Sequence, residues 1–345
     1  MIIGNFDTDK EILIVAEIGN NHEGSYALAE ELVGRAADCG VQAVKFQTFK
    51  TEQFIAPGNP ARFRQLKSYE LSYAQFEKLS RAAKAAGLLF LSTPLDLQSA
   101  AFLEPLVSAY KIASGDNTFY PLIEQIAATG KPVILSGGMA DVETLGRSQN
   151  LIADIWTRNG FKQDLAVLHC VTAYPVAPAQ INLAAIRHLR EALGCTVGYS
   201  DHALGIDAAA YSAYAGARII EKHFTIDKNH SAFRDHSLSA DPDDMKHLVE
   251  RVREACLLLG AGVKRAQPAE LEIEKAVRRS IAAGRDLPKG TVLTWSDLAW
   301  TRPATGLPPG DEKRVLGGKL AIDVTAGEAI LPEHLCDPKP FSKME

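Results

Sequence analysis

Two histidines in the second half of the chain have the residue type and spacing of metal ligands. His202 follows the apolar run of residues 196–200, and His223 follows the next run, residues 218–221. Two imidazoles that leave coordination positions open for water and substrate suit a divalent cation such as Mn²⁺ or Mg²⁺. Taken singly, either histidine is explained equally well as a hydrogen-bonded core residue. Their positions at the ends of consecutive runs favour a metal site between them.

A carboxylate and two lysines stand at similar positions and indicate a site for a charged substrate. Glu17 ends an apolar run and precedes a turn rich in Gly and Asn, where it can act as an acid, a base or a partner of a sugar hydroxyl; a solvated loop acid is the alternative. Lys45 and Lys111 also end apolar runs, and lysine is rarely buried without a partner. Converging at one mouth, the two would hold a phosphate and a carboxylate as fixed charges. The spacing does not exclude a Schiff-base lysine, as in aldolases.

Small polar residues follow two of the same runs. Ser114 lies just beyond Lys111, and Ser136 opens the sequence Ser-Gly-Gly-Met after the fifth run. Hydroxyls and free backbone amides in such turns receive phosphate oxygens, although a glycine pair after a strand is weak evidence alone. Asp235 lies in a loop beyond the last run, from which it can reach the site. Arg302 is a lone arginine further on, and the residues around it give it no role.

These side chains are carried by a regular alternation of short apolar runs and helix-like stretches. Short continuous apolar runs are typical of buried parallel strands, and apolar residues at helical spacing between them indicate covering helices. Eight such strand–helix units predict an α/β fold, a (β/α)8 TIM barrel, with its chemistry at the carboxyl ends of the strands. The predicted strands lie at residues 12–17, 43–45, 88–92, 109–111, 133–136, 166–169, 196–200 and 218–221, and the predicted helices at 26–39, 72–86, 121–129, 181–193, 208–215 and 242–259.

The composition changes near Gly260, which divides the chain into domains. Residues 1–260 are predicted to form the catalytic barrel. Within them, residues 51–68 are rich in Pro, Gly, Gln and Arg and are predicted to form an irregular loop over the barrel mouth. Residues 261–277 are predicted to be a linker.

Residues 278–345 are predicted to form a small separate domain with an internal repeat. The stretch 286–298 matches 323–335 in step, each with a turn, a Gly, a short strand and a one-turn helix that ends in Leu. This duplication predicts a compact β-rich unit with pseudo-two-fold symmetry. Because so small a unit buries little surface alone, we expect it to pack on a barrel.

Composition limits the expected partners and compartment. A net charge of −5 over 345 residues argues against a nucleic-acid binder. No apolar stretch approaches about 18 residues, so no segment is expected to span a membrane. Five scattered cysteines without CxxC spacing indicate reduced thiols, and the N-terminus lacks signal-peptide features, so a cytoplasmic protein is expected.

Ten short motifs follow one another along nearly the whole chain. They are Glu17-Ile-Gly-Asn-Asn-His-Glu-Gly24, Val44-Lys45-Phe-Gln47-Thr48, Ser92-Thr93-Pro94, Tyr110-Lys111-Ile-Ala-Ser114-Gly115, Leu135-Ser136-Gly-Gly-Met139, Leu168-His169-Cys170, Tyr174-Pro175, Tyr199-Ser200-Asp201-His202, Glu221-Lys-His223-Phe224-Thr225 and Arg302-Pro303. In this order the chain resembles the bacterial sialic acid (N-acetylneuraminate) synthases and their relatives that make legionaminic and pseudaminic acids. The C-terminal part resembles the SAF (antifreeze-like, β-clip) domain of the same family.

The resemblance implies an enzyme that condenses phosphoenolpyruvate (PEP) with the aldehyde of an open-chain N-acyl hexosamine, such as N-acetylmannosamine, to give a nine-carbon 2-keto sugar acid and phosphate. It implies a divalent metal at His202 and His223, with Mn²⁺ expected and Mg²⁺ or Co²⁺ as alternatives. PEP is expected on Lys45, Lys111, Ser114, Ser136 and Ser200. The implied catalytic residues are Glu17, Lys45, Lys111 and Glu221, and the implied substrate-binding residues are Gln47, Ser114, Asp116, Ser136, Thr172, Tyr174, Ser200, Asp235 and Arg302.

The resemblance also implies a domain-swapped homodimer. In the family, an arginine that matches Arg302 is offered by the small domain of one subunit to the barrel of the other, where it contacts the N-acyl sugar. The resemblance thus gives Arg302 the role that its own sequence surroundings do not.

Three positions depart from the family's pattern and leave the acceptor open. Asp116 stands where sialic acid synthases have Glu, Thr172 where they have Asn, and residues 304–306 read Ala-Thr-Gly instead of Gly-Asn-Gly. N-acetylmannosamine, its 6-phosphate and a 2,4-diacetamido-trideoxyhexose all remain open, with an unphosphorylated acceptor favoured because no further basic cluster serves a 6-phosphate. The alternatives are a PEP-aldose phosphate condensation of the 3-deoxy-octulosonate or heptulosonate type, and a non-catalytic carbohydrate-binding barrel.

Overall fold

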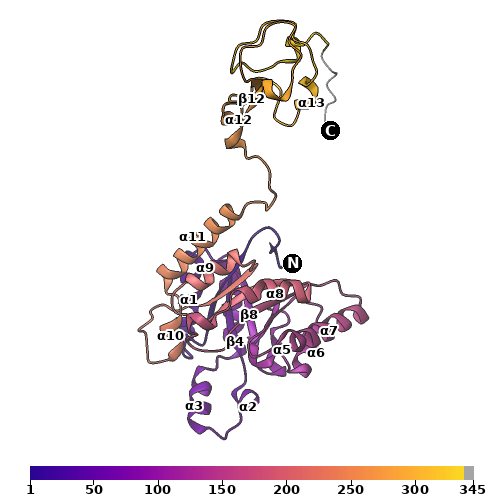
Figure 1. The fold of residues 1–345 in the computed structure, drawn as a ribbon. Coiled ribbons are helices and arrows are strands. Elements are labelled where there is room, and N and C mark those ends of the chain that lie inside the picture. The colour runs from indigo at the N-terminus through magenta and orange to yellow at the C-terminus, as the bar shows by residue number, and fades with distance from the viewer. Residues whose placement is uncertain (338–345) are drawn as a thin grey trace. The chain divides into compact units, whose positions relative to one another are not determined.

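Eight parallel strands close into a barrel, in the order β10-β3-β4-β5-β6-β7-β8-β9, with helices around them (Figure 1). The computed structural model describes residues 1–337, and the chain divides after Gly260 into a barrel unit and a C-terminal unit. The strands are β3 (Leu13–Gly19), β4 (Ala43–Thr48), β5 (Leu89–Pro94), β6 (Tyr110–Ile112), β7 (Val133–Ser136), β8 (Leu165–Cys170), β9 (Thr196–Asp201) and β10 (Ile219–His223). The predicted TIM barrel is thereby confirmed.

In the described part of the chain, nine helices surround the barrel strands. The helices are α1 (Tyr26–Asp38), α4 (Tyr73–Ala85), α5 (Leu97–Leu103), α6 (Tyr120–Ala128), α7 (Val142–Asn159), α8 (Ala184–Leu193), α9 (Asp207–Tyr214), α10 (Arg234–Leu238) and α11 (Pro242–Leu259). Three of them, α5, α7 and α10, were not predicted from the sequence, and α10 carries Asp235, which was predicted to lie in a loop. The sequence did contain the end signals of α7, because the Asp141 side chain accepts a hydrogen bond from Thr144 N and Gly160 ends the helix at a φ of 70°.

The segment 51–68 is not the irregular loop that was predicted. It forms α2 (Thr51–Phe54) and α3 (Pro60–Tyr69), which project from one end of the barrel (Figure 1). Asn59 caps α3 by accepting a hydrogen bond from Arg62 N, and Pro60 occupies its first turn. Only Leu66 and Tyr69 of α3 are buried, so the helix has almost no apolar periodicity that would reveal it in the sequence.

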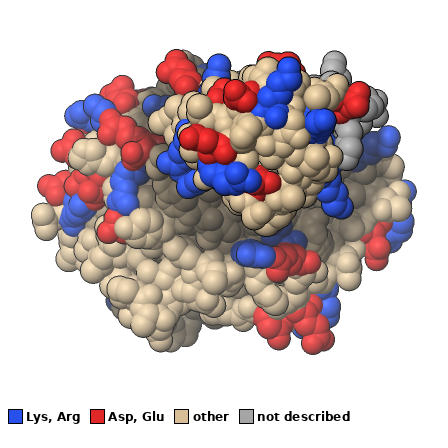
Figure 2. All heavy atoms as spheres, turned by 45° about the horizontal axis from the view of Figure 1, so that its top comes forward, with Lys and Arg blue, Asp and Glu red and all other residues tan. Residues whose placement is uncertain are grey.

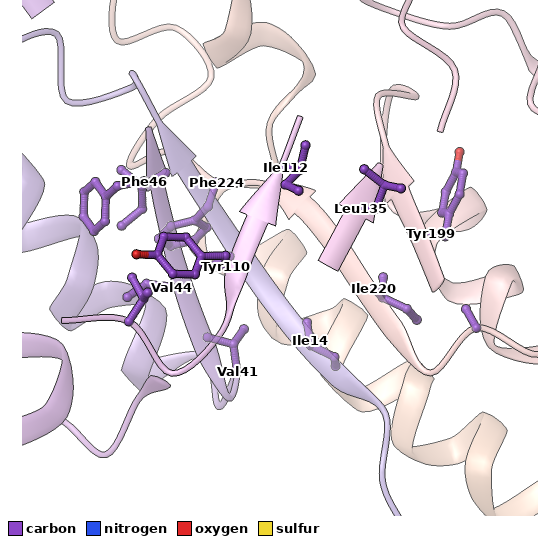
Figure 3. Close-up of a cluster of buried hydrophobic side chains, with 14 of the residues drawn as sticks. Ile14, Val41, Val44, Phe46, Tyr110, Ile112, Leu135, Tyr199, Ile220 and Phe224 are labelled. Atoms are coloured by element: carbon purple, nitrogen blue, oxygen red, sulfur yellow. The ribbon is translucent and has the colours of Figure 1, made fainter. Parts of the chain in front are cut away.

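Alternation along the strands separates the residues that face the helices from those that face the barrel interior. Ile14, Phe46, Tyr110 and Ile220 belong to the large cluster between strands and helices (Figure 3). The inner cluster holds the residues of opposite parity, such as Leu13, Val15, Ala43, Ala109, Ile134, Leu168 and Ile219. Since side chains repeat every second residue, the next inward positions after these are Glu17, Lys45, Lys111, Ser136, Cys170 and Glu221. The polar ends of most predicted runs therefore point into the mouth of the barrel, whereas Ser92 and His169 have the opposite parity and do not.

The opposite end of the barrel is closed by a small hairpin that the sequence analysis did not predict. β1 (Ile2–Ile3) pairs antiparallel with β2 (Phe6–Asp7). Met1 and Ile3 are buried against the inner cluster, with Phe6 packed beside them. An apolar plug at this end keeps water out of the barrel interior, so the polar mouth is the accessible end.

The C-terminal unit contains the predicted internal repeat as two interlocked halves. Its elements are α12 (Leu271–Val277), β11 (Ser280–Ala283), β12 (Leu298–Thr301) and α13 (Glu312–Val315), with β11 antiparallel to β12. Leu287 and Val324, which occupy the same position in the two copies, exchange backbone hydrogen bonds. The matched pairs Leu293 with Ile330 and Leu298 with Leu335 lie in one buried cluster. The repeat thus places equivalent side chains in a shared core.

The segment predicted to be a linker, residues 261–277, carries helix α12. The end of the predicted 278–345 domain lies outside the described residues, from 338 onward.

Within residues 1–337, no helix combines the length and apolarity needed to cross a bilayer. On the face drawn in Figure 2, lysines and arginines are interspersed with aspartates and glutamates rather than gathered into one basic surface.

Candidate active site

A cavity of about 340 Å³ lies at the carboxyl ends of the barrel strands. All of the predicted site residues line it except Asp235 and Arg302. Asp235 is buried on α10 and acts electrostatically on His223, whereas Arg302 is an exposed residue of the C-terminal unit. The cavity is also lined by residues that the sequence analysis did not select, namely Phe54, Thr93, Leu95, Ala113, Gly115 and Cys170.

The floor of the cavity is a buried cluster of two lysines and two glutamates. Glu17 Oε2 lies 2.6 Å from Lys45 Nζ, and Glu221 lies between the lysines, 3.7 Å from Lys45 Nζ and 3.8 Å from Lys111 Nζ. Neutral hydroxyls complete the cluster: Lys45 donates to Thr93 Oγ1 at 3.1 Å, Lys111 donates to Ser136 Oγ at 2.7 Å, and Ser200 Oγ donates to Glu221 at 2.9 Å. The two ammonium groups are therefore fixed in place, with serine hydroxyls beside them, as a dianionic ligand requires.

Burial and the neighbouring charges separate the acidities of the two carboxyl groups. Burial raises the pKa of Glu17, and Lys45 only partly offsets the rise. Burial also favours the neutral form of Glu221, but Lys111 and Lys45 outweigh it and lower the pKa of Glu221 to about 2. Two carboxyl groups with acidities pushed apart mark an acid/base assignment. Glu17 is the group suited to hold and release a proton, while Glu221 remains ionised.

The two lysines also differ in acidity. Burial would favour neutral Lys45, yet Glu17 and Glu221 raise its pKa. For Lys111 burial dominates and lowers the pKa, because Glu221 opposes it only in part and the charge of Lys45 adds to it. The two glutamates thus keep Lys45 protonated without a ligand, whereas an anionic ligand would favour the protonated form of Lys111.

A chain of amide groups orients Glu17, and its first member was missed in the sequence. Asn20 Nδ2 donates to Gln47 Oε1 at 3.0 Å, and Gln47 Nε2 donates to Glu17 Oε1 at 3.1 Å. Because Gln47 uses its oxygen toward Asn20, its amide nitrogen must face the carboxylate. Asn20 lies within the quoted Glu-Ile-Gly-Asn motif, but its function becomes visible only when β3 and β4 are placed side by side.

His202 and His223 meet at the ends of the neighbouring strands β9 and β10 and have the properties of metal ligands. Their ring centroids are 5.5 Å apart. His202 Nδ1 lies 2.8 Å from the carbonyl oxygen of Val171, so this nitrogen carries the proton and Nε2 keeps its lone pair. Burial lowers the pKa of His223 to about 4, which leaves the imidazole neutral at pH 7, and its buried Nδ1 has no partner among residues 1–337. These residues fit a divalent cation.

The protein supplies few ligands at this pair. Within the described part of the chain, no three His, Cys, Asp or Glu side chains gather closely enough to hold a metal ion. A cation at His202 and His223 would therefore keep positions open for water and for a substrate oxygen. This open arrangement suits a catalytic rather than a structural metal.

Of the three positions at which the sequence departs from the pattern of the sialic acid synthases, two lie at the cavity and one lies in the C-terminal unit. Asp116 and Thr172 both line the cavity, and burial raises the pKa of Asp116 to about 6 although Lys111 opposes the rise. Gly138 must stay a glycine there, because a Cβ would lie 2.2 Å from Thr172 Oγ1 and 2.6 Å from Ser114 Oγ. Residues 304–306 belong to the C-terminal unit.

A (β/α)8 barrel whose strand ends hold fixed lysines, an ionised and a proton-holding carboxyl group, and two adjacent imidazoles has the site of a barrel enzyme that acts on an anionic substrate. The profile of the NeuB family matches residues 32–264, and that of the SAF domain matches residues 278–335. The chain belongs to the NeuB family and carries a SAF domain at its C-terminal side.

Curated relatives and a solved structure agree with this assignment. The chain is 38% identical to the N,N'-diacetyllegionaminic acid synthase of Legionella pneumophila over 93% of this chain and 94% of the relative. It is 34% identical to a pseudaminic acid synthase of Campylobacter jejuni over 96% of this chain and 98% of the relative. The N-acetylneuraminic acid synthetase of Leptospira borgpetersenii superposes with a TM-score of 0.74 at 31% identity, covering 79% of this chain and 94% of that one. The predicted synthase is thereby confirmed as an enzyme of this sialic acid and nonulosonate synthase family.

Proposed function

We propose that this protein condenses PEP with the aldehyde of an unphosphorylated, open-chain 2,4-diacetamido-2,4,6-trideoxyhexose. The observation that supports the reaction is that one cavity is lined by two buried lysines and two adjacent imidazoles. The lysines and the hydroxyls of Ser136 and Ser200 suit the phosphate and carboxylate of PEP. The imidazoles would hold Mn²⁺, which as a Lewis acid makes an aldehyde more electrophilic.

The chemistry requires one new carbon–carbon bond, one water and the transfer of both protons of that water. C3 of PEP bonds to the aldehyde carbon, whose oxygen gains one proton; water adds to C2 and loses one proton; the second proton of that water is lost as the bond between C2 and the phosphate oxygen breaks, so that the 2-keto group and hydrogen phosphate form. Lys45 and Lys111 hold the charge of PEP while electrons leave its double bond. Glu17, with its raised pKa and its orientation fixed by Gln47, is the group for the proton that water loses.

Three observations support the choice of acceptor. Among the described residues that line the cavity, Lys45 and Lys111 are the only lysines or arginines, which leaves no separate cation for a sugar 6-phosphate. Phe54, Leu95 and Ala113 give one side of the cavity an apolar surface that suits methyl groups. The named relatives include synthases of legionaminic and pseudaminic acids. N-acetylmannosamine is the second candidate, because it shares the 2-acetamido group.

The first test of the reaction is phosphate release from PEP with Mn²⁺ and a panel of acceptors. The panel contains a 2,4-diacetamido-2,4,6-trideoxymannose, N-acetylmannosamine, its 6-phosphate, arabinose 5-phosphate and erythrose 4-phosphate. We expect turnover with the diacetamido sugar, weaker turnover with N-acetylmannosamine, and none after EDTA treatment. Turnover with only the pentose or tetrose phosphate would assign the protein to the 3-deoxy-octulosonate or heptulosonate type. No turnover and no binding of PEP or Mn²⁺ would favour a non-catalytic barrel.

We further propose that the active form is a domain-swapped homodimer in which Arg302 of the partner subunit contacts the acceptor. Arg302→Ala should raise the acceptor KM about tenfold or more and leave the PEP KM within about twofold, because a hydrogen bond from a charged donor contributes roughly 1.5–3 kcal/mol. Steady-state kinetics with each substrate varied in turn measures both constants. The matched control is Arg278→Ala, which removes an exposed arginine of the same unit that pairs with Glu274.

Mixing two impaired variants tests the swap itself. In a swapped dimer of one Arg302→Ala and one His223→Ala subunit, one site keeps an intact barrel and receives an intact arginine. When the two variants are unfolded and refolded together, part of the activity should therefore show the low acceptor KM of the wild type, which neither variant shows alone. Equal effects of Arg302→Ala on both KM values, or no recovery on mixing, would contradict the swapped arrangement.

A further inference from the structure

We propose that Arg234 is a positioning residue of the acceptor site, holding Tyr174 beside His202 and Asp235 beside His223. This inference rests on the proposed function, since it concerns the same metal and acceptor site. Arg234 is the first residue of α10, in the segment that follows β10, and it does not line the cavity itself. Its side chain nevertheless contacts both residues that approach the two imidazoles.

The first contact runs through Tyr174. The guanidinium carbon of Arg234 lies 4.4 Å from the centroid of the Tyr174 ring, within the range of a cation–π contact. The same ring lies 4.1 Å from the ring of His202 and meets His223 edge-on at 6.2 Å. Tyr174 is only half-buried and stands in the loop after β8, so a stacked cation restricts a ring that the backbone alone leaves mobile.

The second contact runs through Asp235. Nε of Arg234 donates to Asp235 Oδ1 at 2.9 Å, and Nη2 forms an ion pair with the same oxygen at 2.8 Å. Asp235 is 8% exposed, and its backbone oxygen accepts a hydrogen bond from Ser239 Oγ. The residue after Ser239, Ala240, donates its N–H to the backbone oxygen of His223. A buried carboxylate held by the guanidinium therefore keeps one orientation at the segment that is bonded to the end of β10.

Arginine is the residue type that can make both contacts at once. Its planar guanidinium offers an edge of N–H donors to a carboxylate and a flat face to an aromatic ring. A lysine has one compact ammonium group and cannot present an edge and a face together. Tyr174, Arg234 and Asp235 therefore act as one unit, which we name the Arg234 clamp. This clamp positions the two imidazoles, His202 and His223.

The experiment compares Arg234→Ala and Arg234→Lys with the wild type. We expect Arg234→Ala to raise the acceptor KM about tenfold and the PEP KM less than twofold, since a cation–π contact and a charged hydrogen bond are both lost. Arg234→Lys should recover only part of the loss, because it restores charge without the planar fork. In parallel, electron paramagnetic resonance titration of the substrate-free protein measures the Mn²⁺ Kd, which should rise about tenfold, the lower end of the range for residues that orient metal ligands.

Double-mutant cycles decide whether Arg234 acts through the clamp. In a Tyr174→Leu background, and separately in an Asp235→Asn background, Arg234→Ala should cost clearly less than it does in the wild type, because its partner is already gone. Independent, multiplicative effects in both backgrounds would overturn the proposal. So would equal rises in both KM values with an unchanged Mn²⁺ Kd, which is the signature of a general structural role.

The chain offers a matched control remote from the cavity. Arg251 on α11 pairs with Asp207 and lies over the Tyr211 ring at 5.4 Å, so it repeats the Arg–Tyr–Asp arrangement outside the site. Arg251→Ala should leave both KM values and the Mn²⁺ Kd within about twofold of wild type, as expected for an exposed ion pair. If the wild type turned over no acceptor, the proposed function would fail, while the Mn²⁺ titration and its cycles would still test the clamp.

Discussion

Replacing His223 with alanine should abolish Mn²⁺ binding and reduce Mn²⁺-dependent turnover by about 1000-fold or more, since a Lewis-acid metal contributes several kcal/mol and each 1.36 kcal/mol is tenfold. The proposed metal site has two histidine ligands, His202 and His223. Within residues 1–337 no group of three ligating side chains offers the metal another site. The His223 ring is 7% exposed and neutral at pH 7, so its lone pair is ready for a cation without prior loss of a proton. Isothermal titration with Mn²⁺ and phosphate-release assays measure the two effects separately.

A second histidine of the barrel provides the control for this variant. His169 Nε2 lies 2.7 Å from the carbonyl oxygen of Ile181, and its ring does not line the cavity. His169→Gln should keep Mn²⁺ binding within a few-fold of wild type, because only a peripheral hydrogen bond changes. Wild-type Mn²⁺ affinity in His223→Ala, with the fold intact by circular dichroism, would show that the histidine pair is not the metal site.

The sequence predicts the barrel well because its signal is local. A buried parallel strand needs a short apolar run, and six of the eight predicted runs end in a polar residue that lines the mouth. The prediction fails where a segment buries few residues, or where its structure depends on contacts with residues far away in the sequence. The segment with α2 and α3 buries few residues and shows no periodicity, while the Met1–Ile3 plug depends on contacts with strands far along the chain.

The site residues also divide into those with a local signal in the sequence and those without one. Glu17, Lys45, Lys111, His202 and His223 are visible because a polar residue after an apolar run is unusual. Thr93 and Cys170 also face the cavity, but their side chains lie in runs where a small or apolar residue is unremarkable. Asn20 and Arg234 act through Gln47, Tyr174 and Asp235, so only three-dimensional neighbours reveal them.

The second large effect is expected at Lys111, where methionine should reduce kcat/KM for PEP about 100- to 1000-fold. The substitution keeps the length of the side chain but removes a cation that is 4% exposed and lies 3.8 Å from Glu221. Lys111 and Lys45 together keep Glu221 ionised, so without Lys111 the cavity has one cation fewer for PEP and Glu221 has only Lys45 as a counter-charge. Loss of one preorganised group that stabilises developing charge typically costs about 100- to 1000-fold in rate. Initial rates with PEP varied at saturating acceptor measure the loss.

The buried lysine Lys222 distinguishes loss of PEP binding from loss of stability. It alternates with Glu221 and His223 on β10, points away from the cavity, and pairs with Asp201 at 3.0 Å. Lys222→Met should lower the melting temperature, because it leaves Asp201 buried and unpaired, yet it should change the PEP KM by less than about threefold. If the two lysine variants lowered stability alike and Lys111→Met kept the wild-type PEP KM, Lys111 would have no part in PEP binding.

The pH dependence of PEP binding gives a further check on Lys111 with a definite sign. Burial lowers the pKa of Lys111, and only the protonated amine attracts PEP, so the PEP KM of the wild type should rise as pH increases through that lowered pKa. Lys111→Arg carries a guanidinium that stays protonated at every pH used for the assay. The alkaline rise in the PEP KM should therefore disappear in this variant, even if its KM at pH 7 is higher. An alkaline rise of the same size and midpoint in Lys111→Arg would assign the titration to another group, so that Lys111 would serve only as a fixed charge.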